Sequence, residues 1–366
     1  MNDPNLSSRP ATDNGGNPSD TPPRHPVTPP TLNAVNTLHP RLALFDPDER
    51  AVPALPVCDH YSGVDARMRK SLQLQAELGP VFDVTLDNED GAPVGGEVEH
   101  AHLIAELLAS ADNRFGRVGV RVLPVDHPRF ADVVAVVLAA RRRPAYIMLP
   151  KPRSAAEVQQ AAAAIDAGGG AHIPLHALVE THGALRDVHA LAAHPRIESL
   201  SFGLMDFVSA HRGAIPQSAM GVQGQFDHPL VVRAKLEIAA ACHAEGKVPS
   251  HCVVTEFKDT GALQAAAESA AQRFGYTRMW SIHPAQIRPI VDAFTPSAAE
   301  IDQAIEILQA AQAAQWAPIR HRDTLHDRAS YRYFWNLLQR AHQTSYAGGA
   351  QLPAELCQSF FGDTGD

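Results

Sequence analysis

From about residue 54 onward, short apolar runs alternate with longer stretches in which apolar residues recur at helical spacing. The runs that we predict as strands are Ala54–Val57, Val81–Asp87, Val118–Leu123, Ala145–Pro150, Ile173–Glu180, Ile197–Asp206, Val248–Val254 and Arg278–His283. The helices that we predict between them are Val64–Leu78, Glu97–Ser110, Arg129–Arg142, Ser154–Ile165, Ala184–Ala193, Pro229–Glu245 and Gly261–Phe274. The apolar runs lack clean alternation, which is typical of parallel strands buried on both faces.

Eight strands that alternate with helices predict an α/β fold, a TIM (β/α)₈ barrel. The repeating region spans about 240 residues, close to the roughly 250 that such a barrel usually needs. A doubly wound open sheet is the competing interpretation. No Gly-rich turn follows an early strand, and the count of eight is the number that barrel closure requires, so the pattern favours the barrel.

Changes in composition and apolar patterning divide the chain into four parts. They are a disordered N-terminal tail (1–38), a barrel domain (39–295), a C-terminal helical extension or lid (296–346) and a loosely ordered tail (347–366). The first part is rich in Pro, Asn, Ser and Thr and cannot bury enough apolar surface to offset its ordering entropy. In the extension, Ser297 followed by Glu300 predicts a capping box at the start of helix Ser297–Trp316, and a second helix is predicted at Ser330–His342.

Composition and charge narrow the class of protein. The chain has 366 residues, 45% of them hydrophobic, and a net charge of −9, which argues against a nucleic-acid or anionic-membrane partner. The longest apolar stretch, Ala131–Ala140, is far shorter than the roughly 20 residues of a membrane span. Four cysteines without C-x-x-C spacing indicate reduced thiols. Together with an N-terminus that has no apolar signal segment, these features predict a cytoplasmic globular protein.

Polar side chains gather where the predicted strands end. These residues are Asp87, Glu89, Asp90, Arg121, Lys151, Glu180, Asp206 and His283. In a TIM barrel the active site lies at the C-terminal ends of the strands. Charged residues of both signs that each follow a strongly apolar run therefore predict an active site at this rim.

Glu180 and Asp206 are the predicted metal ligands. Each ends a predicted apolar strand, and the two strands are consecutive, so their carboxylates fall on adjacent rim positions. Two carboxylates with open coordination positions suit Mg²⁺, with Mn²⁺ as an alternative, and a substrate with a carboxylate and an α-oxygen could fill the open positions. The competing interpretation is that either acid caps the following helix or pairs with Arg121.

Arg121 is the predicted clamp for a substrate carboxylate, because its planar fork binds carboxylates through two parallel hydrogen bonds. An internal ion pair with Asp87 or Glu89 is the alternative, and the two roles are compatible. We expect Asp87 and Glu89 to orient Arg121 and metal-bound water. Lys151 allows a rival Schiff-base mechanism, in which a desolvated lysine attacks a carbonyl, but a structural ion pair is the simpler interpretation.

Six segments, in order, resemble the citrate lyase beta-subunit and malyl-CoA lyase branch of the HpcH/HpaI aldolase/citrate lyase family. The segments are 86–92 (LDNEDGA), 120–122 (VRV), 148–151 (MLPK), 177–181 (ALVET), 201–206 (SFGLMD) and 281–286 (SIHPAQ). The resemblance implies a trimeric or hexameric TIM barrel with Mg²⁺ on Glu180 and Asp206. It also implies that Arg121 binds the oxo- or hydroxy-acid end of the substrate.

The resemblance further implies a catalytic carboxylate in a neighbouring subunit's C-terminal lid, at the position that Asp327 matches. Arg121, Asp87, Glu89 and Asp327 are then the catalytic residues, with Lys151 and His283 as additional substrate-binding residues of the rim. The implied chemistry is a reversible Claisen-type cleavage of a 3-hydroxyacyl-CoA such as malyl-CoA or citramalyl-CoA. Asp327 would handle the proton as the acyl-CoA enolate forms.

The sequence also departs from the family pattern. Val52–Cys58 lacks the arginine that often precedes the first strand and serves CoA, Asp59–Gly63 stands in place of the usual Pro-Gly, and Leu123 stands where Asn is common. Two alternatives therefore remain. One is a CoA-independent class II aldolase that releases pyruvate or another 2-oxo acid, and the other is a catalytically silent lyase-like subunit. The long C-terminal extension favours the CoA-ester lyase, because the smaller aldolases generally lack a lid.

Overall fold

Eight parallel strands close into a barrel in the computed structural model, which describes residues 38–46, 49, 52–345 and 351–362. The strands are β1 (Cys58–Ser62), β2 (Phe82–Asp87), β3 (Val118–Arg121), β4 (Ile147–Leu149), β5 (Leu175–Val179), β6 (Ile197–Phe202), β7 (Val248–His251) and β8 (Arg278–Ser281). Each strand pairs with the next, and β8 pairs back with β1, so the predicted TIM barrel is confirmed. The predicted disordered tail, residues 1–38, lies outside the described residues except for its last one.

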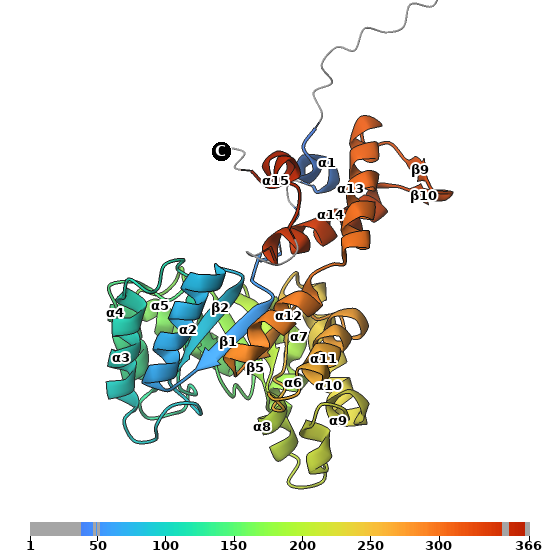
Figure 1. The fold of residues 1–366 in the computed structure, drawn as a ribbon. Helices are drawn as coiled ribbons and strands as arrows, with labels where there is room; N and C mark the ends of the chain where they lie inside the picture. Colours follow the sequence, from blue (N-terminus) through green and yellow to red (C-terminus); the bar gives the residue numbers. More distant parts are fainter. Residues whose placement is uncertain (1–37, 47–48, 50–51, 346–350, 363–366) are drawn as a thin grey trace, which may run out of the picture. The chain divides into compact units, whose positions relative to one another are not determined.

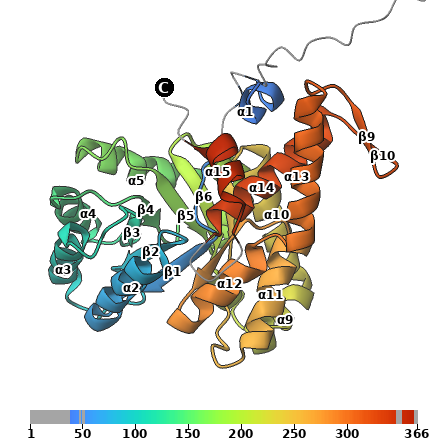
Figure 2. The same ribbon diagram turned by 45° about the horizontal axis from the view of Figure 1, so that its top comes forward.

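Helices surround the barrel and cover the outer faces of its strands (Figures 1 and 2). They are α2 (Asp65–Leu78), α3 (Glu97–Ala109), α4 (Phe130–Ala139), α5 (Ala155–Ala167), α6 (His182–Arg186), α7 (Val188–Ala193), α8 (Leu204–Ser209), α9 (Gly224–Asp227), α10 (Pro229–Ala244), α11 (Thr260–Arg273) and α12 (Ile287–Phe294), with 3₁₀ turns η1 (Gln217–Met220) and η2 (Pro284–Gln286). The single helix predicted at Ala184–Ala193 is divided at Asp187 into α6 and α7.

Two predicted strands differ from the observed ones in a way that affects the site. The first strand is Cys58–Ser62 rather than Ala54–Val57, since its ladders with β2 and β8 both begin at Cys58. Gly63 therefore directly follows β1. The sixth strand ends at Phe202, and the backbone turns at Gly203 into α8.

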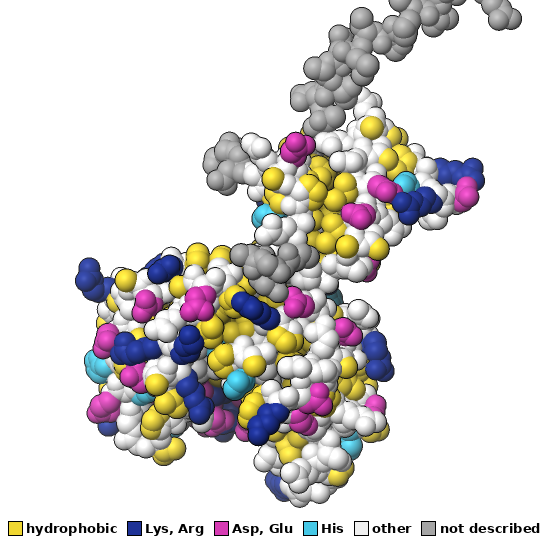
Figure 3. All heavy atoms as spheres, viewed as in Figure 1, with side chains coloured by type: hydrophobic (Ala, Val, Ile, Leu, Met, Phe, Trp, Pro, Cys, Tyr) yellow, Lys and Arg dark blue, Asp and Glu magenta, His cyan; other side chains and the backbone are white. Residues whose placement is uncertain are grey.

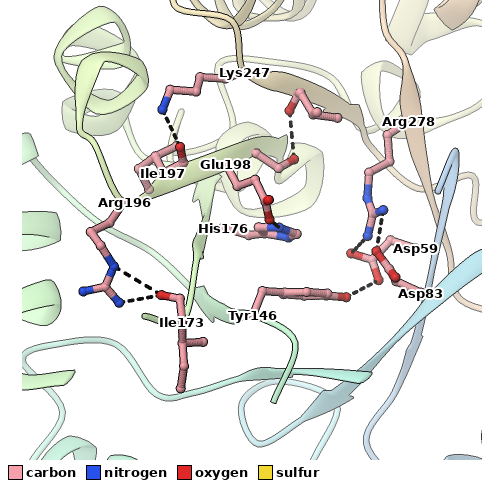
Figure 4. Close-up of polar contacts among 12 residues, drawn as sticks. Asp59, Asp83, Tyr146, Ile173, His176, Arg196, Ile197, Glu198, Lys247 and Arg278 are labelled. Atoms are coloured by element: carbon pink, nitrogen blue, oxygen red, sulfur yellow. Dashed lines mark hydrogen bonds and ion pairs between the residues drawn. The ribbon is translucent and has the colours of Figure 1, made fainter. Parts of the chain in front are cut away.

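The interior of the barrel contains a buried ionic layer (Figure 4). Arg278 on β8 pairs with Asp83 on β2 (Nη1–Oδ2, 2.7 Å) and Asp59 on β1 (Nη2–Oδ2, 3.2 Å), and all three side chains are at most 1% exposed. Two residues further along β1 and β8, Tyr61 and Trp280 stack with their ring centroids 4.7 Å apart. Since side chains alternate along a strand, these rings form the next interior layer toward the C-terminal ends.

The C-terminal helices build a second hydrophobic core of their own. It contains α13 (Ala298–Ala313), α14 (Arg328–Gln343), α15 (Ala354–Phe361) and the short helix α1 (Pro40–Leu44), with a hairpin of β9 (Ile319–His321) and β10 (Thr324–His326). The capping box at Ser297 and Glu300 is confirmed. The prediction of a loosely ordered end is wrong for Ala354–Phe361, because Leu356 and Phe360 are buried in this core. Leu44, assigned by sequence to the barrel domain, is also buried here.

Charged side chains of both signs are interspersed over the barrel face drawn in Figure 3. The described part of the chain contains no helix with the length and apolar character needed to cross a bilayer. All four cysteines are free, as the sequence predicted.

Candidate active site

Arg121 and Asp87 form a buried ion pair at the C-terminal rim of the barrel. They are the last residues of β3 and β2 and stand opposite each other in the ladder. Two parallel hydrogen bonds join them, Nε to Oδ1 at 2.7 Å and Nη2 to Oδ2 at 2.6 Å, while Nη1 reaches Glu89 Oε2 at 3.0 Å. Two of the five guanidinium N–H groups are thus hydrogen-bonded to Asp87, and Nη1 forms an ion pair with Glu89, so the remaining N–H groups can still serve a ligand.

Two glycines allow this ion pair to form. Asp87 also accepts hydrogen bonds from the backbone amides of Glu89 (2.9 Å) and Gly91 (2.7 Å). A β-carbon at position 91 would collide with the Asp87 carboxylate, and one at position 63 would collide with the Gly91 carbonyl. The run after β2 therefore acts as a support that orients Arg121, as the sequence suggested, and Gly63 and Gly91 are site residues that sequence reasoning missed.

Lys151 lies in an acidic cluster of the same rim. Its Nζ hydrogen-bonds Glu89 Oε1 and Asp90 Oδ2 (2.7 Å) and lies 3.8 Å from Asp206 Oδ1. Burial alone would lower the pKa of Lys151, but the hydrogen bonds to Asp90 and Glu89 outweigh burial and raise the pKa above its usual value. A protonated amine is not a nucleophile, so the geometry favours the ion-pair interpretation over a Schiff-base lysine.

Glu180, the residue after β5, is a buried carboxyl group with only 3% of its surface exposed. The backbone amide of Lys151 donates to its Oε1 at 2.7 Å. On its other side lies Gly203, where a β-carbon would collide with Glu180 Oε2. Burial, followed by the nearby negative charge of Asp206, raises the pKa of Glu180 to about 8, although Arg121 and the Lys151 amide act in the opposite direction.

Asp206 lies in the first turn of α8, not at the end of the sixth strand where the sequence placed it. Gly203, the N-cap of α8, lies three residues earlier, and the helical turn brings the carboxylate back to the rim. The Asp206 side chain is 43% exposed, in contrast to Glu180. The two carboxylates thus differ sharply in solvation although they lie at one site.

A cavity of about 400 Å³ opens onto these residues. Its polar wall consists of Asp87, Asp90, Arg121, Glu180, Asp206, Arg67 and Ser62, and its apolar wall of Tyr61, Val64, Phe202, Leu204, Met205, Val253, Trp280 and Ile282. A second hollow of about 390 Å³ shares Glu180 and Asp206 and adds Lys151 and Thr181. The carboxylate pair therefore borders both hollows, which leaves room for ligand atoms on either side of it.

Glu180 and Asp206 fit a divalent cation of the Mg²⁺ type by the chemistry of their donors. Their charges are close enough to disfavour ionisation of Glu180, and a bound cation would relieve that repulsion. No group of three or more His, Cys, Asp or Glu side chains is arranged to hold a metal within residues 38–46, 49, 52–345 and 351–362. A cation here would take two protein carboxylates and fill its remaining positions with water or substrate oxygens, as Mg²⁺ commonly does.

The remaining two predicted site residues have local structural roles. His283 is exposed, caps η2 by accepting the amide of Ala285 at 3.2 Å, and stacks on Phe257 with ring centroids 4.9 Å apart. It is not among the residues that line either hollow. Asp327 is the N-cap of α14, and its Oδ1 accepts the amides of Ala329 and Ser330. The substrate-binding role of His283 and the proton-transfer role of Asp327 stay predictions.

Tyr61 and Trp280 are further residues of the site that the sequence did not reveal. Tyr61 packs between Trp280 and Arg121, with the guanidinium carbon 4.7 Å from the Tyr61 ring centroid. The misplaced first strand hid Tyr61, since only the correct strand phase shows that it faces the interior at the rim. Trp280 could have been found, because it precedes the 281–286 segment within the predicted eighth strand.

Comparison with known proteins identifies the family. The family model described as HpcH/HpaI aldolase/citrate lyase matches residues 82–284, which confirms the resemblance noted in the sequence. The L-malyl-CoA/beta-methylmalyl-CoA lyase of Cereibacter sphaeroides is 28% identical over 284 residues, which cover 72% of this chain and 87% of that protein. A (3S)-malyl-CoA thioesterase of the same species is 28% identical over 248 residues, covering 67% and 81%.

Solved structures show the same fold. The crystal structure of a citrate lyase from Burkholderia xenovorans LB400 matches with a TM-score of 0.76 and 56% identity, covering 89% of this chain and 99% of that one. Protein CitE of Mycobacterium tuberculosis, solved in complex with magnesium, acetoacetate and coenzyme A, matches with a TM-score of 0.63 and 22% identity, covering 79% and 98%. At 22% identity the second match speaks for the fold alone.

Proposed function

The chain belongs to the HpcH/HpaI aldolase/citrate lyase family, and we propose that it is a Mg²⁺-dependent lyase that cleaves or forms a 3-hydroxyacyl-CoA. Malyl-CoA and citramalyl-CoA are the substrates that we expect. The observation that carries the proposal is that the Glu180–Asp206 pair and the Arg121–Asp87 pair border one cavity. A metal site beside a group that binds the substrate carboxylate is what carbon–carbon cleavage with release of a 2-oxo acid needs. The relatives named as malyl-CoA lyases support the substrate class.

Each residue has a defined task in this reaction. Glu180 and Asp206 would hold the Mg²⁺, which when bound polarises the oxygen on the carbon that becomes the oxo group. Arg121, fixed by Asp87, orients the carboxylate of the hydroxy-acid end with its remaining donors. The stacked Tyr61 and Trp280 rings close the floor of the cavity and exclude water beneath the reacting carbons.

The proton transfer is assigned to Asp327 from a neighbouring copy of the chain, in a homotrimer or homohexamer. Both of the cap hydrogen bonds to the Asp327 side chain end on Oδ1, so Oδ2 is the oxygen that would carry the proton. The Asp327 carboxylate takes the proton of the substrate's hydroxyl group as the carbon–carbon bond breaks, which leaves an acyl-CoA enolate and an oxo acid. The protonated Asp327 then delivers its proton to the enolate carbon.

Product analysis tests which bond breaks. The purified chain is incubated with (S)- and (R)-malyl-CoA, with citramalyl-CoA and with a hydroxy-oxo-diacid, and the products are separated by chromatography. A lyase gives acetyl-CoA with glyoxylate or pyruvate in equal amounts. Release of free CoA and the intact hydroxy acid would instead identify a thioesterase, and cleavage of the diacid alone would identify a CoA-independent aldolase. Ligand binding without turnover would favour the silent-subunit alternative.

A further inference from the structure

Lys151 contacts both carboxylates of the proposed metal site, one through its backbone and the other through its side chain. Its amide donates to Glu180 Oε1 at 2.7 Å, and its Nζ lies 3.8 Å from Asp206 Oδ1. Glu180 follows β5 and Asp206 lies on α8, whereas Lys151 follows β4. A single residue from a third element therefore bridges two ligands that the chain supplies separately.

The backbone of Lys151 is held in a conformation that non-glycine residues rarely adopt. Its φ is +49°, in the left-handed region. Neighbouring contacts fix this loop: the hydroxyl of Thr181 donates to the Pro152 carbonyl at 2.7 Å, and Gly183 packs against the Arg153 carbonyl so closely that a β-carbon would collide. Strain of this kind persists only where the surroundings over-determine it, and it is concentrated at functional sites.

The side chain of Lys151 also connects the metal ligands to the substrate clamp. Nζ hydrogen-bonds Glu89 Oε1, and the other oxygen of Glu89 forms an ion pair with Arg121 Nη1 at 3.0 Å. Charges therefore alternate from Asp206 through Lys151 and Glu89 to the guanidinium. A displacement of the Lys151 ammonium would therefore change the positions of both Asp206 and Arg121.

We propose that Lys151 is a positioning residue that acts as the resident counter-cation of the Glu180–Asp206 pair. It keeps the two carboxylates in place relative to Arg121 and limits how tightly they bind Mg²⁺. This inference rests on the proposed function. A cation fixed beside Asp206 repels an incoming divalent cation and competes for the same oxygens. Loss of the ammonium therefore strengthens Mg²⁺ binding while it weakens catalysis, whereas a purely structural lysine would affect both in the same direction or neither.

The test compares Mg²⁺ binding and turnover in matched variants. Lys151→Met removes the charge and keeps the length of the side chain, and Lys151→Arg restores the charge. Lys247→Met is the structural control, because Lys247 is buried and donates to the carbonyls of Ile197 (2.6 Å), the first residue of β6, and His194 (3.4 Å). Calorimetry of Mg²⁺ binding without substrate gives Kd, and steady-state kinetics gives kcat and KM.

We expect Lys151→Met to lower the Kd for Mg²⁺ by about tenfold and kcat by at least about thirtyfold, as loss of one nearby charge and of a positioned clamp would do. Lys151→Arg should return Kd to within about threefold of the unaltered value. Lys247→Met should lower the melting temperature and leave Kd unchanged. If Lys151→Met does not fold, Lys151→Asn carries the same comparison, because Asn tolerates the left-handed region.

The outcomes separate the inference from the proposed function. A Kd in the lysine variant that equals or exceeds that of the unaltered chain would overturn the positioning role, while Mg²⁺ binding by the unaltered chain would still support the proposed function. An unaltered chain that binds no Mg²⁺ at millimolar concentration would overturn both.

Discussion

Gly203 lies against the buried carboxylate of Glu180 so closely that a β-carbon at position 203 would collide with Oε2 and with the Glu180 side-chain carbons. The backbone of Gly203 has φ −90°, which any residue can adopt. The glycine is therefore required by the space that Glu180 occupies and not by backbone conformation.

Gly203→Ala should consequently displace Glu180 from the metal site. Overpacking at such a contact costs about 1–3 kcal/mol, so the melting temperature should fall and the Kd for Mg²⁺ should rise at least about tenfold. Gly221→Ala is the matched control, because its β-carbon would meet its nearest neighbour, Glu256 Oε1, at an ordinary 3.4 Å. Calorimetry of both variants checks the prediction, and unchanged Mg²⁺ binding in Gly203→Ala would argue against Glu180 as a ligand.

Mg²⁺ binding should strengthen with pH up to about 8, the raised pKa of Glu180. Below that pH the folded chain must release a proton from Glu180 to bind the cation, so the affinity should fall about tenfold per pH unit. The same shift predicts that Glu180 destabilises the fold as pH rises from 4.5 to about 8, because the folded state retains a proton that the unfolded state releases. Glu180→Gln should remove both the pH dependence of Mg²⁺ affinity and the loss of fold stability with rising pH. A pH-independent Kd in the unaltered chain would contradict this account.

The ionic layer inside the barrel should matter for stability far more than surface pairs do. Arg278→Met would remove the buried arginine that pairs with Asp59 and Asp83, although Asp83 keeps its pair with Arg117, and loss of one member of such a group costs about 3–5 kcal/mol. Arg69→Met removes the exposed pairs with Asp65 and Glu106 and should leave the urea midpoint nearly unchanged. Urea unfolding measures both changes. Equal destabilisation by the two substitutions would show that the buried ion pairs of Arg278 do not stabilise the barrel more than a surface pair does.

The two roles of Asp327, helix cap and proton carrier, can be separated by substitution. Asn caps helices as well as Asp does, so Asp327→Asn should keep the melting temperature within about 2 °C yet lower turnover at least about a hundredfold. Ser330→Ala removes the other half of the capping box, in which the Ser330 hydroxyl accepts the Asp327 amide at 3.0 Å. That variant should lose stability and keep its chemistry. Normal turnover in Asp327→Asn would remove Asp327 from the mechanism.

The barrel could be predicted well because each of its eight strands is buried and each following helix buries one face. Burial of this kind produces the apolar runs and the helical spacing that the sequence shows. The prediction failed at the first strand, where Asp59, which faces the interior, and the buried His60 interrupted the expected apolar run. In β2 the apolar side chains of Phe82, Val84 and Leu86 pack outward against the helices, while Asp83, Thr85 and Asp87 face the interior. A barrel with a polar interior therefore does show alternation, although every residue of the strand is buried.

The rim residues could be predicted because strand ends are visible in a sequence, but their partners could not. The structure brings together Asp87, Arg121, Lys151, Glu180 and Asp206. The tight packing of Gly63, Gly91 and Gly203 depends on which strands are neighbours, so no local pattern shows it. The exposure of the two carboxylates could not be predicted either, because Glu180 and Asp206 follow similar apolar runs. They differ in burial because α8 turns Asp206 outward.

The central claim, that Glu180 and Asp206 hold the Mg²⁺ of a carbon–carbon lyase, is tested most directly by metal removal. Release of glyoxylate or pyruvate from the acyl-CoA panel is followed with Mg²⁺, with EDTA, and in Glu180→Gln and Asp206→Asn. We expect EDTA to stop cleavage reversibly and each substitution to lower turnover at least about a hundredfold, with the fold intact by circular dichroism. Cleavage that continues in EDTA, or near-normal rates in both variants, would contradict the metal assignment.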